Sequence, residues 1–352
     1  MADTSYRILY DGEQWFGSNA GSCARALRRL GHSVMALQIN DSIPNWQGRG
    51  LKLLRRALRP RLVREHNRLL LAAARIFQPH LFLVFKGAHL YPATLSQLRD
   101  QGVALYNYYP DVSAFTHTYS YLPSALQLYD CVFSTKTFFA NDLARRGYPL
   151  RRFEWLPHGY DPEAHRPLSL SEAEISFYGA DVAFVGAFGP GKEQILAGLR
   201  KLLPNLNLVI WGDAWSKAAS PELTGCIRGR GVYGDEYTRA VCASHILLGL
   251  LSVRQSGSSL GDQVTSRSFN IPACGAFLLH QRNPEILQFY QEGREIECFD
   301  SVPELAEKIR YYLAHPEKRQ AVAQAGYRRC VPAYAHDQRM QTIIQWHQAQ
   351  GC

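Results

Sequence analysis

The stretch that decides the fold reads Asp181-Val-Ala-Phe-Val-Gly-Ala-Phe-Gly-Pro-Gly-Lys-Glu193. An apolar strand, Val182–Val185, runs into a glycine-rich loop, and the loop opens a helix. Free backbone N–H groups and the helix dipole at such a helix start attract phosphate, and Lys192 adds a cation. The stretch therefore predicts a strand–loop–helix unit of an α/β fold that can bind an anion.

Two familiar phosphate-binding motifs fit this loop poorly. Gly186 to Lys192 matches the first part of a P-loop, but Glu193 stands where magnesium coordination needs Ser or Thr. A dinucleotide fold wants G-x-G-x-x-G, whereas the loop offers G-x-x-G-x-G. We favour a diphosphate site of another kind over an NTP hydrolase and over a turn without a ligand.

The same alternation of apolar strands and helices extends in both directions. Upstream, strands are predicted at 7–10, 34–39, 81–85, 103–108, 131–134 and 153–156; downstream, at 182–185, 206–211, 246–251, 276–279 and 295–298. Strands separated by helices indicate parallel sheets covered on both faces. We expect two facing Rossmann-like, doubly wound domains with a cleft between them. The predicted parts are an N-terminal domain (1–160), a linker (161–172), a C-terminal domain (173–334) and a C-terminal helix (335–352) that can cross back to the first domain.

Length and composition agree with this organisation. The 352 residues suggest about two domains, and 46% hydrophobic residues suffice for buried cores. No apolar run approaches the ~18 residues of a membrane span, and the first strand begins so early that we expect no signal peptide. Eight cysteines without a C-x-x-C pair favour a reduced, cytoplasmic protein and argue against structural zinc.

The excess positive charge is local. Residues 1–167 account for the whole net charge of +9, and Arg49–Arg68 alone carries eight bases against one acid. Leucines recur at helical spacing beside these bases, and Pro60 is expected to split the stretch into two helices. The segment is either a solvated amphipathic pair or a surface for anionic lipid or an anionic acceptor, with Arg55, Arg56 and Arg59 as its test residues. No nucleic-acid-binding motif accompanies it.

A second polar block, Asp262-Gln-Val-Thr-Ser-Arg-Ser-Phe-Asn270, precedes a helix that ends at Gly275. Arg267 lies near the start of that helix, where its guanidinium can bind phosphate in a fork. Asp262 and Asn270 can both face one ligand. Helix capping with a surface arginine is the alternative interpretation.

These blocks carry a family resemblance. Asp262–Leu279, Glu295–Phe299 and Glu304–Arg319 resemble the C-terminal signature of the CgeB-like (spore maturation protein type) glycosyltransferases, a branch of the GT-B group 1 enzymes. Phe85-Lys-Gly87, Asn107-Tyr-Tyr-Pro-Asp111 and Leu156-Pro-His-Gly-Tyr-Asp161 are similar to the N-terminal half of the same family.

The resemblance implies a nucleoside-diphosphate-sugar as donor, bound mainly by the C-terminal domain. Asp262 and Asn270 fall on the two positions of the Glu-x7-Glu pair of the retaining enzymes, and Asn270 departs from the usual Glu. The other implied donor-binding residues are Gly17, Ser18, Gly186, Gly189, Lys192, Tyr233, Arg267 and Ser268. The chain contains no D-x-D motif, so neither a metal nor another cofactor is expected, and the analogy implies retention of configuration.

The N-terminal domain should hold the acceptor. Asp111 follows a strand end and is our candidate for orienting or deprotonating an acceptor hydroxyl, with a turn or N-cap role as the alternative. Lys86, His89 and His117 are further acceptor-side candidates, and Asp262 is the second catalytic candidate.

The sequence thus predicts a metal-independent glycosyltransferase acting on an unknown acceptor: a cell-surface glycan, a lipid-linked molecule or a small molecule. The protein would be cytoplasmic, with a peripheral contact to the inner face of the membrane through Arg49–Arg68. A nucleotide-sugar-binding protein or an epimerase on the same fold are the alternatives.

Overall fold

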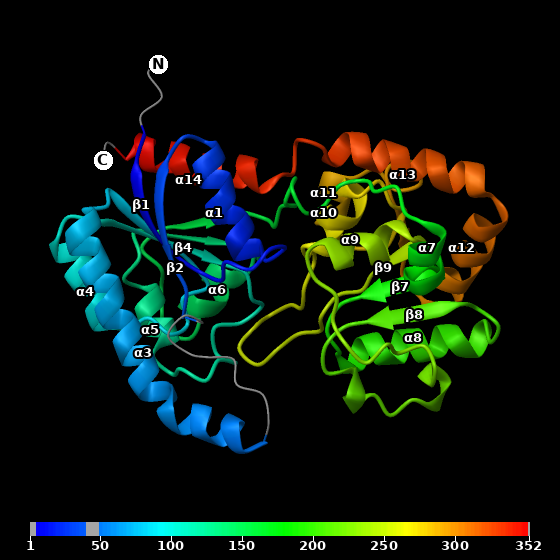
Figure 1. Cartoon of the computed structure of the whole chain (residues 1–352), viewed down its shortest axis with the longest axis horizontal. Helices are drawn as coiled ribbons and strands as arrows, with labels where there is room; N and C mark the ends of the chain where they lie inside the picture. The colour runs from blue at the N-terminus through cyan, green and yellow to red at the C-terminus, as the bar shows by residue number, and fades with distance from the viewer. Residues whose placement is uncertain (1–4, 40–48, 351–352) are drawn as a thin grey trace. The chain divides into compact units, whose positions relative to one another are not determined.

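The computed structural model describes residues 5–39 and 49–350, with the backbone alone for residues 49–55. The chain forms two compact units (Figure 1). The N-terminal unit comprises Met1–Pro157, Arg254–Leu260 and Asp337–Cys352. The C-terminal unit comprises His158–Val253 and Gly261–His336. Each unit is built on one parallel sheet, which confirms the predicted pair of Rossmann-like α/β folds.

The N-terminal sheet has the strand order β2-β1-β3-β4-β5-β6, and all its pairings are parallel. Its strands are β1 (Arg7–Asp11), β2 (Ser33–Leu37), β3 (Leu81–Phe85), β4 (Ala104–Tyr109), β5 (Cys131–Ser134) and β6 (Phe153–Trp155). Because β1, β3 and β4 are neighbours, the residues that follow them meet at one edge of the sheet.

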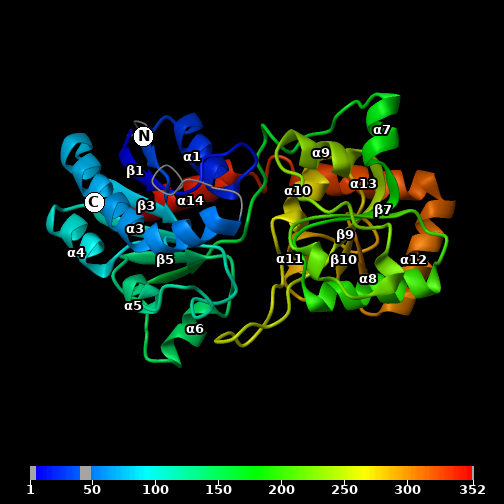
Figure 2. The same ribbon diagram turned by 60° about the horizontal axis from the view of Figure 1, so that its bottom comes forward.

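Helices cover both faces of this sheet because its strands are apolar on both sides. Ile8 and Tyr10 of β1 pack with α1 (Asn19–Arg29) and α14 (His336–Ala349), whereas Leu9 faces α3 (Arg49–Phe77) and α4 (Pro92–Asp100). The two clusters place α3 and α14 on opposite faces of the sheet, and Figure 2 shows both helices beside its strands. The remaining helices of this unit are α5 (Leu122–Leu126) and α6 (Phe139–Ala144).

The C-terminal sheet has the order β11-β10-β9-β7-β8, again fully parallel. Its strands are β7 (Ala180–Val185), β8 (Leu208–Trp211), β9 (Ser244–Gly249), β10 (Leu278–Gln281) and β11 (Glu297–Phe299). Its helices are α7 (Glu172–Tyr178), α8 (Pro190–Leu202), α9 (Asp235–Cys242), α10 (Arg267–Ala273), α11 (Ile286–Phe289), α12 (Val302–Ala314) and α13 (Pro316–Cys330), with two short 3-10 turns at Trp215–Lys217 and Pro221–Leu223.

Two segments differ from the prediction. Pro60 does not divide the basic stretch, because α3 continues through it as one helix. Pro60 is exposed, so water can satisfy the carbonyl that its missing N–H leaves unpaired, and buried residues such as Leu70 and Ala74 anchor the rest of the helix. The sequence reading also missed α7, which begins with a capping box between Ser171 and Glu174.

Two segments from late in the sequence belong to the N-terminal unit. In residues 254–260, the Ser256 carbonyl accepts a hydrogen bond of 2.6 Å from Ser113 Oγ, and the Ser259 amide donates to Asp142 Oδ2 at 2.6 Å. In α14, His347 Nδ1 lies 2.7 Å from the hydroxyl of Tyr106 on β4. None of the helices within the described ranges combines the length and apolarity needed to cross a membrane.

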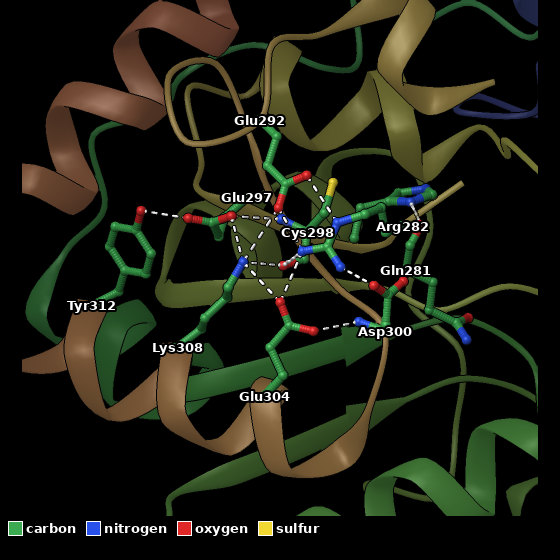
Figure 3. A network of polar contacts seen from close by, with 10 residues as sticks. Gln281, Arg282, Glu292, Glu297, Cys298, Asp300, Glu304, Lys308 and Tyr312 are labelled. Carbon is green, nitrogen blue, oxygen red and sulfur yellow. Dashed lines mark hydrogen bonds and ion pairs between the residues drawn. The ribbon is translucent and has the colours of Figure 1, made fainter. Parts of the chain in front are cut away.

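An ion-pair network fastens the β10–β11 edge of the C-terminal sheet to α12 (Figure 3). Arg282 contacts Glu292, Glu304 and Asp300. Lys308 donates to Glu297 Oε1 at 2.8 Å and lies 3.2 Å from Glu304 Oε1. Since these groups bind one another, the network serves to hold the elements together.

Candidate functional site

The strand–loop–helix unit around Gly186 is present as predicted. Strand β7 ends at Val185, and α8 begins at Pro190 with Gly189 as its N-cap. Lys192, in the first helical turn, is 7% exposed, and its Nζ donates to the Ala187 carbonyl at 3.3 Å. The helix start and the Lys192 ammonium therefore share one loop at the carboxyl end of the sheet.

Arg267 joins this loop from α10, of which it is the first residue. Its Nη2 donates to the Leu250 carbonyl, just beyond β9, at 2.7 Å. A Cβ at Gly186 would lie 2.8 Å from Phe184 Cζ and 2.9 Å from Arg267 Nη1, so a larger residue there would make these side chains shift. The two predicted cations thus meet at the end of β7.

Positive charge exceeds negative charge in this C-terminal site. Burial, together with the charge of Arg267, lowers the pKa of Lys192 to about 8, against a smaller opposing effect of Asp262. Burial likewise lowers the pKa of Arg267. Within the described residues, the buried Arg267 Nε has no hydrogen-bond partner. Two cations face one carboxylate here, which suits a bound anion.

The other predicted donor-site residues of this unit have different roles. Asp262 Oδ2 accepts from the Ser252 amide at 3.3 Å and holds the loop after β9. Asn270 is buried, and its Oδ1 makes no hydrogen bond within the described part of the chain. Tyr233 is exposed and donates to the Asp213 carboxylate.

The hydroxyl of Ser268 is already used inside the protein. Burial lowers the pKa of His280 to about 4, so its ring is neutral, and His280 Nδ1 lies 2.7 Å from the Gln281 carbonyl. That carbonyl can only accept, so Nδ1 carries the proton and Nε2 accepts from Ser268 Oγ at 2.9 Å. The Thr265 amide donates to the same Ser268 oxygen at 3.0 Å. Ser268 therefore has no hydroxyl proton left to donate to a donor substrate.

Gly17 and Ser18 lie in the N-terminal unit, between β1 and α1. Gly17 has a φ of +89°, and Ser18 is the N-cap of α1, where its Oγ accepts from the Gly21 amide at 2.9 Å. The loop geometry needs both residues, and their contact with a donor stays a prediction.

Asp111, after β4, is held by two side chains, Lys86 and His117. Asp111 Oδ2 lies 2.8 Å from Lys86 Nζ and 3.1 Å from His117 Nε2. Burial alone would raise the pKa of Asp111, but the His117 hydrogen bond and the charge and hydrogen bond of Lys86 outweigh it and lower the pKa to about 2. A carboxylate this acidic is a weak base, so the geometry favours orienting an acceptor hydroxyl over deprotonating it.

Lys86 also carries backbone strain. Its φ is +71°, a left-handed conformation that costs a non-glycine residue about 1 kcal/mol or more. Gly87 follows with φ +67°. Strained backbone of this kind gathers at functional sites, and here it stands beside Asp111.

Sequence reasoning missed two partners of His89. Asp11, at the end of β1, and His66, on α3, are both buried and hydrogen-bonded, His66 and His89 each to one oxygen of Asp11. A charged residue closing an otherwise apolar strand was a signal for Asp11. His66 gave no such signal, because only the fold shows that it lies on the inner face of α3.

The structure describes the side chains of two of the three test residues of the predicted basic surface. The side chain of Arg55 lies outside the described residues, and Arg56 is exposed. Arg59 Nε donates to Tyr119 Oη at 2.8 Å, and its guanidinium lies 4.9 Å from the centroid of that ring. Arg59 therefore tethers α3 within the N-terminal unit.

Comparisons with known proteins agree with this picture. Residues 192–345 match a family model described as glycosyl transferase-like. No curated protein sequence matches the chain. A sucrose-phosphate synthase from Thermosynechococcus elongatus has a similar structure, with 14% identity, a TM-score of 0.68 and coverage of 98% of this chain and 99% of that one.

Two further solved structures are similar. The Anabaena protein HepE in complex with UDP-glucose has 12% identity and a TM-score of 0.65, over 98% of this chain and 100% of that one. A Listeria monocytogenes protein described as a putative UDP-N-acetylglucosamine 2-epimerase has 10% identity and a TM-score of 0.55, over 97% and 95%. The fold is GT-B, and within it residues 192–345 are similar to the glycosyl transferase-like family.

Proposed function

We propose that the chain transfers a sugar from a nucleoside-diphosphate-sugar to an acceptor, with the donor bound by the C-terminal unit. The observation that carries this proposal is the pair of buried cations, Lys192 and Arg267, at the start of α8. When the bond from sugar to diphosphate breaks, its electron pair leaves on the phosphate oxygen. Fixed cations and helix N–H groups stabilise that charge.

The reaction would need no metal ion, because Lys192 and Arg267 supply the positive charge that a divalent ion supplies elsewhere. Retention of the anomeric configuration is the outcome we propose, as the family resemblance implies. Since the similar HepE structure holds UDP-glucose, that compound is the first donor to test.

The test measures UDP release from UDP-glucose, with and without monosaccharide, glycerol and lipid-linked acceptors, in EDTA and in magnesium. We expect acceptor-dependent release that EDTA leaves unchanged. Lys192→Ala and Arg267→Ala should lose it while remaining folded. Full activity in both variants would contradict the site, and loss of activity in EDTA would contradict metal independence.

An epimerase is the second candidate, because a structure described as a putative epimerase shares the fold. An epimerase would convert the donor without an acceptor, so product analysis in the absence of acceptor separates the two. A nucleotide-sugar-binding protein without catalytic activity would bind UDP and release no product under any condition.

We also propose that α3 docks on an anionic membrane, as a peripheral contact at its inner face. From Arg61 onward, the exposed residues of α3 fall on one helical stripe: Arg61, Arg64, Glu65, Arg68, Leu69, Ala72, Arg75 and Ile76, with Glu65 ion-paired to Arg68 at 3.3 Å. Leu69 is 48% and Ile76 83% exposed. Arginines beside exposed aliphatic side chains suit an anionic lipid surface.

A further inference from the structure

Asp11, His66 and His89 come together in the N-terminal unit from three separate elements. Asp11 ends β1, His66 lies on α3, and His89 lies in the loop between β3 and α4. His66 Nε2 is 3.0 Å from Asp11 Oδ1, and His89 Nε2 is 2.8 Å from Asp11 Oδ2. One ligand atom from each of the three residues lies within 4.8 Å of the other two. Two imidazole nitrogens and one carboxylate therefore converge on a single point.

The spacing of these atoms is close to that of the ligands around one tetrahedral metal ion. Zinc binds imidazole nitrogen and carboxylate oxygen at about 2.0–2.2 Å, so neighbouring ligand atoms of a tetrahedron lie roughly 3.3–3.6 Å apart. The two nitrogen–oxygen distances here are 3.0 and 2.8 Å. An outward movement of each ring by roughly 0.5 Å, which is within the width of one rotamer, would admit the ion.

The environment of the cluster is dry and well supported. The side-chain exposure is 0% for Asp11, 2% for His66 and 13% for His89. Asn67, the residue after His66 on α3, donates from Nδ2 to the His89 carbonyl at 3.1 Å, and its Oδ1 accepts from the Tyr91 amide at 3.0 Å. The Asn67 side chain therefore ties the backbone around His89 to that of His66. Support of this kind orients the ligands of metal sites before the ion arrives.

The charge of the cluster distinguishes it from the network around Arg282. Arg282 and Lys308 supply the positive charge of that network themselves, so its acidic groups need no further cation. Asp11 is fully buried, and within the described residues its carboxylate has only the two imidazoles as side-chain partners. An imidazole nitrogen that points at a carboxylate carries either a proton or a metal ion. A divalent ion held by both rings would supply the positive charge that the buried carboxylate needs.

We propose that Asp11, His66 and His89 bind one divalent transition-metal ion, zinc being the ion that these ligands fit. Two nitrogens and one oxygen favour zinc and its first-row neighbours over magnesium and calcium, which take oxygen ligands. The ligand set contains no thiolate, so the lack of a C-x-x-C pair does not count against zinc here. The ion would fasten β1, α3 and the loop after β3 to one another. This role is separate from the proposed function, because Lys192 and Arg267 of the other unit need no ion for sugar transfer.

The first test measures metal binding and needs no activity. The full chain, stripped of metal with EDTA and dialysed, is titrated with zinc chloride against a chromophoric chelator. We expect saturable binding of one ion per chain, and His89→Gln should weaken it at least about a hundredfold, more than the loss of an outer hydrogen-bond partner does. His245→Gln, an exposed histidine of the other unit, should bind zinc as the wild type does. Equal zinc affinity in the wild type and in His89→Gln would leave this cluster without a metal.

The second test uses cobalt(II) on the wild type, so it does not depend on whether a variant folds. The chain has eight cysteines, and thiolates also bind zinc. A thiolate bound to cobalt absorbs strongly in the near ultraviolet, whereas imidazole and carboxylate ligands do not. We expect the visible bands of a four- or five-coordinate ion at one equivalent, no thiolate band, and loss of the visible bands when zinc is added. A thiolate band at one equivalent, or no visible bands, would overturn the inference.

The third test separates this site from the proposed function. Because an ion that binds only the folded protein stabilises it, a hundredfold excess of zinc over its Kd should raise the melting temperature of the wild type by about 5 °C. Magnesium should not do so, nor should zinc added to His89→Gln. A melting temperature that zinc leaves unchanged would contradict the fastening role of the ion. Well below the melting transition the stripped protein stays folded, so EDTA should leave UDP release unchanged. A wild type that binds zinc but releases no UDP would count against the proposed function alone.

Discussion

Lys192 and Arg267 approach the same aromatic ring: Nζ lies 5.9 Å and Cζ 5.3 Å from the centroid of Phe184. Two cations that share one ring repel each other, and the repulsion adds to the burial that lowers the pKa of Lys192 to about 8. The arrangement is costly in the free protein and favourable once an anion arrives. Removing the charge of Lys192 should therefore weaken anion binding and raise the stability of the ligand-free protein.

UDP affinity should fall as pH rises. Lys192 is charged below pH 8 and loses its proton above it, whereas a bound diphosphate favours the charged form. Binding therefore takes up a proton above pH 8, and we expect about a tenfold weaker Kd at pH 9.5 than at pH 7. Calorimetry in buffers of different ionisation enthalpy measures both the Kd and the number of protons taken up on binding. In Lys192→Met, binding should be weaker at pH 7 and its pH dependence should be lost.

The same substitution should stabilise the ligand-free protein. The folded pKa of Lys192, about 8, lies below the unfolded value of about 10.4, so the unfolded chain binds more protons between these values. Stability then rises with pH across this window. Lys192→Met should raise the free energy of unfolding at pH 7 by about 1–3 kcal/mol and flatten that rise. Urea titrations at pH 7 and pH 10 measure it, and a destabilised variant would contradict the cost assigned to the buried charge.

Asn270 should matter for ligand binding more than for folding. Its buried Oδ1 has no hydrogen-bond partner among the described residues, so Asn270→Ala removes an unsatisfied group. We expect the melting temperature of the free protein to change little and UDP-glucose affinity to weaken about tenfold. Ser268→Ala is the contrasting variant, because it breaks the bond to His280: it should destabilise the fold and spare affinity. If Asn270→Ala destabilised the fold and Ser268→Ala weakened UDP-glucose affinity instead, the roles assigned to these two residues would have to be exchanged.

The sequence predicted the fold well because strand periodicity is a local signal. Leu81–Phe85 and Cys131–Ser134 appear with the predicted bounds, since apolar runs between helices have few alternative structures. Pro60 was misjudged because tertiary packing of the rest of α3 outweighs one missing hydrogen bond.

The C-terminal site was predictable in part for the same reason. Lys192 is adjacent in sequence to the glycine loop that it serves, so its position follows from the motif. The partners of His89 were not predictable, because Asp11 and His66 are separated from it by 78 and 23 positions and meet only through the strand order β1-β3. The role of Ser268 in α10 was also hidden, since its partner His280 lies on strand β10.

The outer stripe of α3 should govern membrane binding. Reversing Arg61, Arg64 and Arg68 to Glu should weaken binding to phosphatidylglycerol vesicles by at least about tenfold, since each base near an anionic surface contributes ~1 kcal/mol. UDP binding should be unaffected, because these residues lie in the other unit. Reversal of three exposed bases of the C-terminal unit, Arg294, Arg310 and Arg328, is the charge-matched control. Equal losses in a vesicle sedimentation assay would show that net charge, and not this stripe, drives the contact.

The network around Arg282 should set part of the acid stability of the C-terminal unit. The hydrogen bond from Arg282 is the main cause that lowers the pKa of Glu304 to about 2, below its unfolded value of about 4.3. A depressed carboxyl pKa stabilises the fold above the unfolded value, and that stabilisation is lost as pH falls from about 4.3 toward 2. Glu304→Gln should therefore cost about 0.5–1 kcal/mol at neutral pH, since the group is largely solvated, and should weaken the pH dependence of unfolding between pH 5 and 2. Glu307→Gln, an exposed residue of the same helix, should change neither. If both variants unfold alike over this range, the ion pairs in Figure 3 contribute no acid-sensitive stability.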